Sequence, residues 1–497
     1  MPLYGVRWFF IAAALLGPGC DQVIGLDRRS PEVTIRYEIH EVRNAPDGSP
    51  TIAVISDPRS FEVVLADGTL PDLVMRPDGA LTFERAAEDQ VYRLAVRLPD
   101  DRFIEYQAVT PTLAIVEPVI GRNDRRAATT GSTVKHVVSN PPAGSTSHVV
   151  TTGLWTQTSQ DVGGAGATSA AFAFPWAAAR SRFGAPGVLL ADLHDRAYAM
   201  STGVAQGRRG TAYFALTHGC THAFSTLGVV PVEMGCTVAP LAFDRCTHVQ
   251  TRFAAELERI AAVLPAAPHP SYFVGWTLAA MPAPALAPTT DLLLGFRFGR
   301  SPSTTPVVEI DDEIPFANPY PGHTVSLLTT ASRERAFAVP DASAFSIDTS
   351  TRHWIVPDAS CEGPEVVPER VTLAHDLVLG DTPLDADERV VVVEPGRELR
   401  LTWNEAATGR ADLYRVVLHR AGNLFGYTVL DTIRTYVVTE RVAVIDPALL
   451  VPGATYFLEV ESRLGYPAAA TGDLGTIGFP ATPYATSRAW SSSFRVP

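Results

Sequence analysis

Short runs in which apolar and polar residues alternate recur along most of the chain, and turn-forming residues separate them. Residues 33–39 and 92–98 are clear examples. Alternation with a period of two is typical of half-buried strands, because successive side chains in a strand point to opposite faces. Asp-Gly turns at 46–48, 66–68 and 77–79 punctuate the first of these runs. The pattern predicts a mainly β chain.

One segment instead has helical spacing, at about 251–264, where Pro265 ends the run. Its apolar positions are Phe253, Leu257, Ile260, Ala261 and Leu264. We expect one helix whose apolar stripe faces the core.

At 497 residues the chain has room for about three domains. We expect a multidomain chain of antiparallel β-sandwiches. Its expected parts are a signal segment (1–20), a first β domain (31–120), a linker (121–146), a central β-rich domain containing the helix (147–367) and a C-terminal domain (383–497). The central part has no repeat of fixed period, and its sequence predicts nothing finer than β-rich.

The C-terminal stretch combines Trp403 at the end of a strand-like run with Leu450-Val451-Pro452-Gly453 leading to Tyr456. It resembles a fibronectin type III domain, in which such a Leu-x-Pro-Gly-x-x-Tyr segment forms a tyrosine corner. The resemblance implies that Trp403 and Leu450 are core residues and that the Tyr456 hydroxyl bonds the preceding loop.

Residues 76–96 of the first β domain resemble the end of a carboxypeptidase-regulatory-like, prealbumin-type sandwich. Arg76-Pro77-Asp78-Gly79 and the two strand-like runs after it carry this resemblance. It implies a module that serves as a spacer.

The chain begins with a basic residue, Arg7, an apolar run at 8–16 and then Cys20. A run this short cannot span a bilayer, which needs about 20 residues. The segment resembles a bacterial lipoprotein signal peptide, although Gly17 stands where Leu is usual and Pro18 is atypical. The resemblance implies that Cys20 is lipidated by acyl chains such as palmitate, and that the chain is anchored to the inner or outer membrane of a bacterial cell envelope. An ordinary cleaved signal and an uncleaved anchor are the alternatives.

Four cysteines remain besides Cys20, namely Cys220, Cys236, Cys246 and Cys361. An even number outside the cytoplasm predicts two disulfides. We expect Cys220 to pair with Cys236 or Cys246, and Cys361 to take the remaining cysteine.

Metal binding is the alternative for the same region. A strand over 217–223 would place its histidines and cysteine on one face. The candidate zinc or copper ligands are His218, Cys220, His222, Cys246 and His248. A second cluster, Glu309, Asp311, Asp312 and Glu313, could bind calcium, but it lacks the EF-hand pattern and predicts a solvated acidic loop.

The composition argues against some classes of function. The net charge of −13 argues against nucleic-acid binding, which needs a basic face. Lys135 is the only lysine, and its neighbours match no phosphate-binding or Schiff-base motif. No cofactor is predicted and no catalytic residue can be assigned.

These observations favour an envelope-anchored lipoprotein with a binding, adhesion or structural display role. Its partners would be the membrane, through the anchor, and an envelope protein or polysaccharide. The alternative is a secreted or periplasmic hydrolase with its active site in the central domain. A deep pocket with converging His, Asp or Glu side chains would favour the hydrolase, and a closed core would favour the binder.

The anchor can be tested by Cys20→Ser, which should move the protein from the membrane fraction to the soluble fraction. Acyl chains contribute about 0.8 kcal/mol per buried methylene, so their loss removes the tether. Immunoblotting of fractionated cells measures the distribution. If the variant stays in membranes as the parent does, lipidation of Cys20 is wrong.

Overall fold

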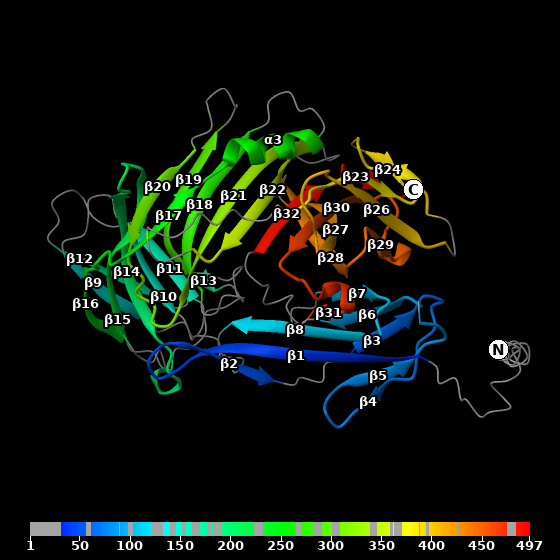
Figure 1. The fold of residues 1–497 in the computed structure, drawn as a ribbon, viewed down its shortest axis with the longest axis horizontal. Helices are drawn as coiled ribbons and strands as arrows, with labels where there is room; N and C mark the ends of the chain where they lie inside the picture. The colour runs from blue at the N-terminus through cyan, green and yellow to red at the C-terminus, as the bar shows by residue number, and fades with distance from the viewer. Residues whose placement is uncertain are drawn as a thin grey trace, which may run out of the picture.

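A computed structural model of the chain shows strands joined into large sheets (Figure 1). The residues it describes are 31–55, 61–88, 90–97, 103–120, 133–139, 146–151, 156–161, 169–175, 180–181, 190–222, 232–264, 271–281, 291–300, 309–337, 345–357, 361, 370–386, 388–393, 397–424, 427–474 and 484–497. The signal segment and most of the expected linker lie outside them. The mainly β prediction is confirmed.

The N-terminal sheet is built around the long strand β1 (Glu32–Asn44). Its neighbours are β2 (Pro50–Ile55), β4 (Val74–Met75), β5 (Leu81–Glu84), β8 (Thr112–Ile120) and the late strand β31 (Asp473–Leu474). β8 runs parallel to β1 on one edge, whereas β5 and β2 occupy successive stretches of the other edge. The sheet is therefore mixed rather than purely antiparallel.

A second layer, β3 (Phe61–Leu65), β6 (Tyr92–Arg97) and β7 (Phe103–Ala108), packs on this sheet. Val33, Ile35, Leu94 and Tyr106 are among the buried side chains between the two layers. Each of the three predicted Asp-Gly turns is present, with glycine φ between +81° and +88°. In the first, the Asp47 carboxylate accepts the Ser49 amide at 2.9 Å.

The central part contributes a long, curved run of strands. They are β9 (Thr133–Ser139), β10 (Thr146–Thr151), β11 (Thr156–Asp161), β12 (Ser169–Pro175), β13 (Arg180–Ser181), β14 (Ala197–Gln206), β15 (Ala212–His222), β16 (Val232–Pro240), β18 (Tyr272–Met281), β19 (Asp291–Arg300), β21 (Thr324–Phe337) and β22 (Phe345–Ile355). A separate pair, β17 (Arg245–Gln250) and β20 (Asp311–Phe316), lies over one face of this sheet.

The C-terminal part has two sheets. The larger group is β25 (Arg389–Val390), β27 (Leu413–Leu424), β28 (Tyr427–Val438), β30 (Thr455–Leu464), β32 (Tyr484–Trp490) and β33 (Phe494–Arg495). The smaller is β23 (Ala374–Leu379), β24 (Thr382–Pro383), β26 (Leu399–Glu405) and β29 (Val442–Ile445). Three-residue 3-10 helices occur at Ala191–Leu193, Pro447–Leu449 and Ala469–Thr471.

Strands from all three parts pair with one another. β22 pairs with β32 over five residue pairs, from Ser350 with Arg488 to Trp354 with Tyr484. β28 in turn pairs in parallel with β7. Backbone hydrogen bonds therefore join the central strands to the C-terminal sheet, and that sheet to the N-terminal layers (Figure 1).

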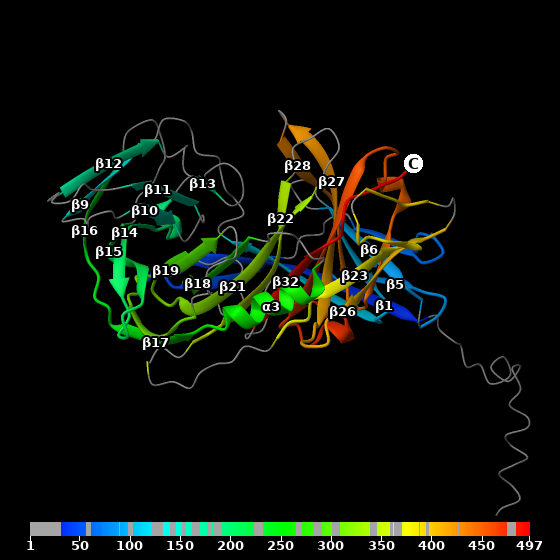
Figure 2. The ribbon, with the colours of Figure 1, turned by 90° about the horizontal axis from the view of Figure 1, so that it is seen from above.

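Helix α3 (Phe253–Val263) is the one α-helix in the described part of the chain, and it lies across β21 and β22 (Figure 2). It confirms the predicted helix within two residues at its start and one at its end. Phe253, Leu257 and Ile260 are buried, but Ala261, which was expected to face the core, is exposed. The buried stripe is narrower than predicted because only one side of the helix packs on β21 and β22. No described helix is long and apolar enough to cross a membrane.

The residue-level expectations for the C-terminal core are confirmed. Trp403, Leu450 and Tyr456 are buried in one cluster. The Tyr456 hydroxyl accepts the Val451 amide at 2.7 Å and donates to the Leu449 carbonyl at 3.4 Å. Its ring stacks on Phe494, with centroids 5.7 Å apart.

Tyr456→Ala should lower the free energy of unfolding by about 3–5 kcal/mol, because it leaves a cavity among buried side chains. Tyr456→Phe keeps the ring but orphans the Val451 amide, and should cost about 1–2 kcal/mol. Urea denaturation measures both values. Tyr427→Ala is the matched control, since Tyr427 is 73% exposed and its loss should cost less than about 0.5 kcal/mol. Equal effects of the two alanine variants would contradict the tyrosine-corner assignment.

Candidate functional site

The acidic segment predicted to be a solvated loop is instead part of strand β20 and its approach. Glu309 stabilises the start of α3, where its carboxylate accepts the amides of Phe253 and Ala254 at 2.9 and 2.7 Å. The residue at the N-cap position, Arg252, provides no side-chain cap. A carboxylate from another element thus satisfies the free amides at the positive end of the helix.

Asp312 is fully buried and holds the turn between β14 and β15. It accepts the amides of Arg209 and Thr211 at 2.7 and 2.8 Å. Burial opposes its ionisation, but these backbone donors prevail and lower its pKa. Gly207 is required at this turn because a Cβ there would lie 2.4 Å from an Asp312 oxygen.

The other two carboxylates of the segment also have protein partners. Asp311 contacts His248 at 2.5 Å and Arg209 at 3.0 Å, and Glu313 contacts Arg208 at 2.8 Å. The four predicted calcium ligands therefore point to separate partners rather than to one centre. The prediction of a solvated loop was wrong because alternation along β20 sends Asp312 inward.

The three cysteines whose side chains are described are in disulfides. Cys246 on β17 is bonded to Cys361, 115 residues away, with a Cα–Cα distance of 5.2 Å. This is one of the two arrangements that the sequence left open. Cys220 is also disulfide-bonded. The side chain of Cys236, its expected partner, lies outside the described part.

The described histidines of the predicted zinc or copper site do not join these cysteines. His218 contacts the Thr217 hydroxyl at 3.1 Å, and His248 is engaged with Asp311. His222 lies outside the described side chains. Among the described residues, one group has donor atoms close enough for a metal, namely Cys246, Glu313 and Cys361. Both of its sulfurs are already in the disulfide, so no thiolate is available there.

A pocket lies between the first turns of α3 and the β21–β22 face beneath them. Its cavity volume is about 80 Å³, room for roughly three water molecules at about 30 Å³ each. Its lining is Gln250, Thr251, Arg252, Phe253, Glu256, Leu327, Thr329, Thr330, Ala331, Thr351, His353, Ile355 and Arg370. Threonine hydroxyls and charged side chains thus face an otherwise apolar wall.

Glu256 and His353 meet in this pocket. Arg259 binds both oxygens of the Glu256 carboxylate through Nη1, at 3.0 and 2.8 Å, and reaches the Val371 carbonyl through Nη2 at 2.7 Å. His353 Nε2 is 3.8 Å from the same carboxylate. Burial opposes ionisation of Glu256, but His353 and Arg259 together lower its pKa to about 2. Glu256 is therefore a fixed anion at neutral pH.

Three buried polar atoms in this pocket have no hydrogen-bond partner in the described structure. They are both ring nitrogens of His353 and the hydroxyl oxygen of Thr351. The two residues are 5% and 0% exposed, so bulk water does not reach them. Buried polar groups in folded proteins are nearly always paired, so this set is a candidate place for a water or a ligand.

A larger cavity of about 430 Å³ lies at the other end of α3, against β23 and Trp490. Its charged groups are already paired. His375 contacts Asp376 at 2.8 Å, Asn404 donates to Asp376 at 3.2 Å, and Arg389 binds Asp385 at 2.6 Å. The smaller pocket is therefore the better candidate site.

Sequence reasoning singled out none of the residues of this pocket. A usable signal was present in β22, where Thr349, Thr351 and His353 alternate as polar side chains on the face that packs against the core. Only the position of α3 shows that this polar stripe is covered.

Compared with known proteins, the chain matches no protein-family model and no curated protein.

The charge of Glu256 should make the protein acid-sensitive. Its folded pKa of about 2 lies below the usual 4.5, so its stabilisation is fully present above pH 4.5 and is lost as the pH falls toward 2. Glu256→Gln should therefore lower the free energy of unfolding by about 3 kcal/mol at pH 7, and the difference from the parent should shrink between pH 5 and 2. Denaturant titrations at each pH measure this.

The control is Glu398→Gln, which removes an exposed partner of Arg400. It should change stability by less than about 1 kcal/mol. If Glu256→Gln is as stable as the parent at pH 7, the ion pairs assigned to Glu256 contribute nothing.

Proposed function

We propose that this chain is an envelope-anchored binding protein that captures a saccharide in the pocket beneath α3. The observation that carries the proposal is the set of unpaired buried atoms on His353 and Thr351. Both nitrogens of an imidazole can form hydrogen bonds, and a hydroxyl can donate as well as accept. Hydroxyl groups on one edge of a sugar ring complement this set.

The remaining lining suits the same ligand. Phe253, Leu327 and Ile355 provide an apolar wall for the carbon face of a sugar ring, while Thr329 adds a further hydroxyl. Arg370 is exposed beside the pocket and can contact a longer chain that leaves it. Binding sites commonly combine a mostly apolar wall with a few polar groups.

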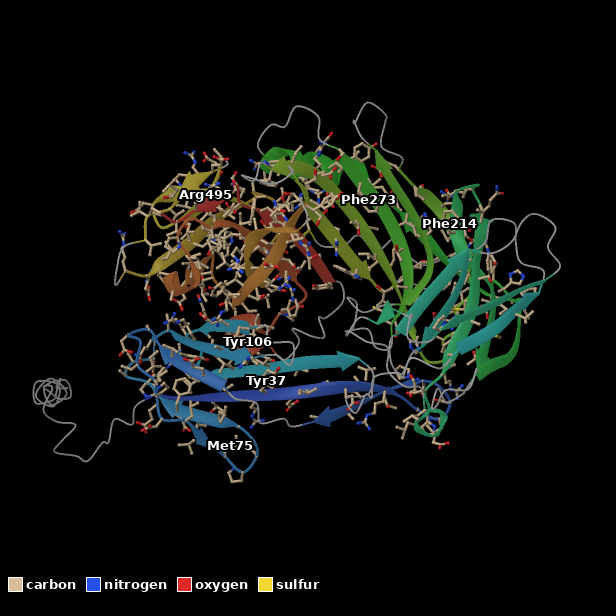
Figure 3. All side chains as sticks on the ribbon, turned by 180° about the vertical axis from the view of Figure 1, so that it is seen from behind. Tyr37, Met75, Tyr106, Phe214, Phe273 and Arg495 are labelled. Atoms are coloured by element: carbon tan, nitrogen blue, oxygen red, sulfur yellow. A yellow bond between two sulfur atoms is a disulfide. The ribbon has the colours of Figure 1, made fainter. Side chains whose placement is uncertain are left out.

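The outer edge of the N-terminal sheet supports attachment near a membrane. β2 and β4 expose apolar side chains, including Ile52, Val54, Val74 and Met75. Figure 3 places Met75 on the side of the sheet away from Tyr106 and the other layers. The β4 part of this edge adjoins the start of β1 through β5, whereas β2 pairs with the end of β1. A tether at Cys20 would hold the β4 part close to the lipid surface.

Hydrolysis is the second candidate, favoured by the approach of His353 to Glu256 within a pocket. A general base could activate water there. Against it, Arg259 occupies both oxygens of Glu256, and the Thr351 hydroxyl makes no hydrogen bond to His353. A nucleophile within reach of its base is the usual mark of covalent catalysis. Binding is therefore the function that the geometry supports better.

Binding can be measured with the soluble Cys20→Ser protein on an array of bacterial envelope oligosaccharides. We expect at least one saccharide to bind, and His353→Ala and Thr351→Val each to weaken it about tenfold or more, since each removes a buried hydrogen bond worth about 1.4 kcal/mol. Thr402→Val, an exposed position on β26, is the matched control and should bind as the parent does.

Two results would contradict the proposal. One is the absence of saccharide binding by the parent protein. The other is equal binding by the parent and His353→Ala. Release of cleaved saccharide by the parent, detected by mass spectrometry and lost in Glu256→Gln, would instead establish the hydrolase.

A further inference from the structure

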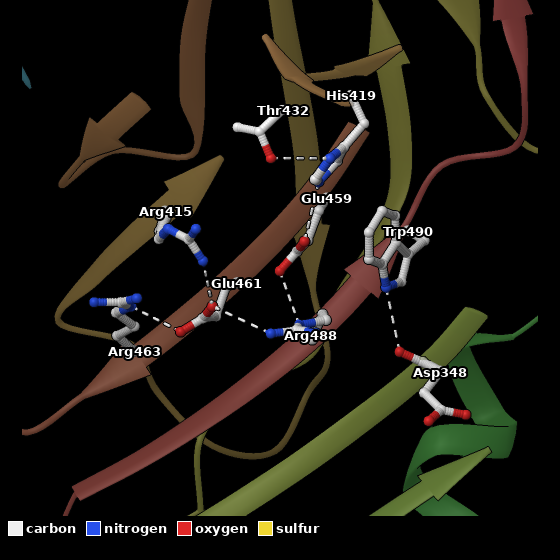
Figure 4. Close-up of polar contacts among 9 residues, drawn as sticks. All are labelled: Asp348, Arg415, His419, Thr432, Glu459, Glu461, Arg463, Arg488 and Trp490. Carbon is white, nitrogen blue, oxygen red and sulfur yellow. Dashed lines mark hydrogen bonds and ion pairs between the residues drawn. The ribbon is translucent and has the colours of Figure 1, made fainter. Parts of the chain in front are cut away.

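A second polar cluster lies on the sheet face opposite the pocket, where β22, β32, β30 and β27 run side by side (Figure 4). Ser350 pairs with Arg488, Arg488 with Glu461, and Glu461 with Arg415. Because directly paired residues share a face, these side chains form one row across four strands. Alternation along β22 separates Ser350 and Arg352 from Thr351 and His353, which face α3.

The two glutamates of this cluster form ion pairs with neighbouring cations. Glu461 contacts Arg463 at 2.8 Å, Arg415 at 3.1 Å and Arg488 at 4.0 Å. Burial opposes its ionisation, but these arginines lower its pKa to about 2. Glu459 contacts His419 at 3.2 Å and Arg488 at 2.8 Å. Neither carboxylate forms an ion pair with any other cation in the described part of the chain.

Arg352 on β22 is a further cation on this face of the sheet. Its guanidinium makes no hydrogen bond or ion pair with any residue that the structure describes, although the side chain is only partly exposed. Burial, followed by the charge of Arg488, lowers its pKa. The next carboxylates on this face, Asp348 and its cross-strand partner Glu334, form no ion pair with it. Acidic residues outnumber basic ones by 13 in this chain. A shortage of carboxylates therefore does not explain why Arg352 forms no ion pair.

Hydroxyl groups lie beside the unpaired guanidinium. Arg352 pairs across the strands with Thr486, and Arg488 pairs with Ser350. The Thr486 and Ser350 hydroxyls make no hydrogen bond within the described part of the chain. On each of the two strands, β22 and β32, one guanidinium group thus lies two positions from one hydroxyl, and each guanidinium faces a hydroxyl on the other strand. Such a set offers only donors and adaptable hydroxyls to a ligand.

We propose that Arg352 and Arg488, with the hydroxyls of Ser350 and Thr486, bind an oxyanion, either a phosphate or a carboxylate group of a ligand. The planar guanidinium fork matches both groups in a two-bond arrangement. Arg352 is partly buried and forms no ion pair, since Glu461 and Asp348 act on it only at longer range, and the oxyanion supplies a direct partner. The site is separate from the pocket beneath α3 and does not depend on its proposed function.

Thermal unfolding with inorganic phosphate, acetate or chloride at equal ionic strength tests the site. Phosphate or acetate should raise the melting temperature of the parent more than chloride does, and Arg352→Gln should lose this extra shift. Arg352→Lys should keep part of it, because it retains the charge without the fork. The control is Arg400→Gln, an exposed arginine paired with Glu398, which should keep the whole shift. Any general stabilisation by phosphate appears in all variants and cancels.

Without the added anions, Arg352→Gln should melt at or above the temperature of the parent, because it removes an unpaired charge. An arginine with a purely structural role would give the opposite result. The proposal is overturned if the parent responds to phosphate and acetate no more than to chloride, or if Arg352→Gln keeps the response. A response to phosphate alone identifies a phosphorylated ligand, and a response to both anions extends the site to acidic sugars.

Discussion

The pairing of β22 with β32 is the contact on which the rest of the structure depends. It bonds the last central strand to a strand far along the chain, since even its closest pair in sequence, Trp354 and Tyr484, is 130 positions apart. Through it the central sheet, the C-terminal sheet and, by way of β28 and β7, the N-terminal layers share one hydrogen-bonded network. Both candidate sites lie on β22, one on each face. A strand held on both edges keeps its side chains in fixed directions, which is what a preorganised site needs.

Paired carboxylates recur at the joints of this molecule, and donors from distant segments hold each of them. Glu309 and Asp312 connect β20 to α3 and to the β14–β15 turn. Glu256 connects α3 to the segment before β23 through Arg259, and Glu461 connects β27, β30 and β32. Such groups stabilise the fold only while they are fully paired, because a buried charge without a partner is costly. For the same reason, the polar atoms of His353, Thr351 and Arg352 that have no hydrogen-bond partner indicate candidate binding sites.

Much of the local structure could be predicted from the sequence. The alternating runs, the Asp-Gly turns, the single helix and the hydrogen bonds of Tyr456 depend on contacts among neighbours in the chain, and the residues themselves carry that information. The predicted buried stripe on α3 was wrong only at Ala261, because the burial of that residue depends on how the helix packs on the sheet. The acidic segment 309–313 was misjudged because its partners, including Arg209, Thr211 and Phe253, are remote in sequence.

The sequence by itself determined the class of fold and the places where the chain turns, since both follow from short-range periodicity and backbone preference. Only the tertiary structure decided which polar residues have partners. His353, Thr351 and Arg352 are consecutive with one another in β22, yet alternate side chains enter different surroundings, a covered pocket on one face and a charged cluster on the other. Whether a side chain has a hydrogen-bond partner depends on a helix and on strands, some of them more than 130 positions away. The local sequence pattern does not contain that information.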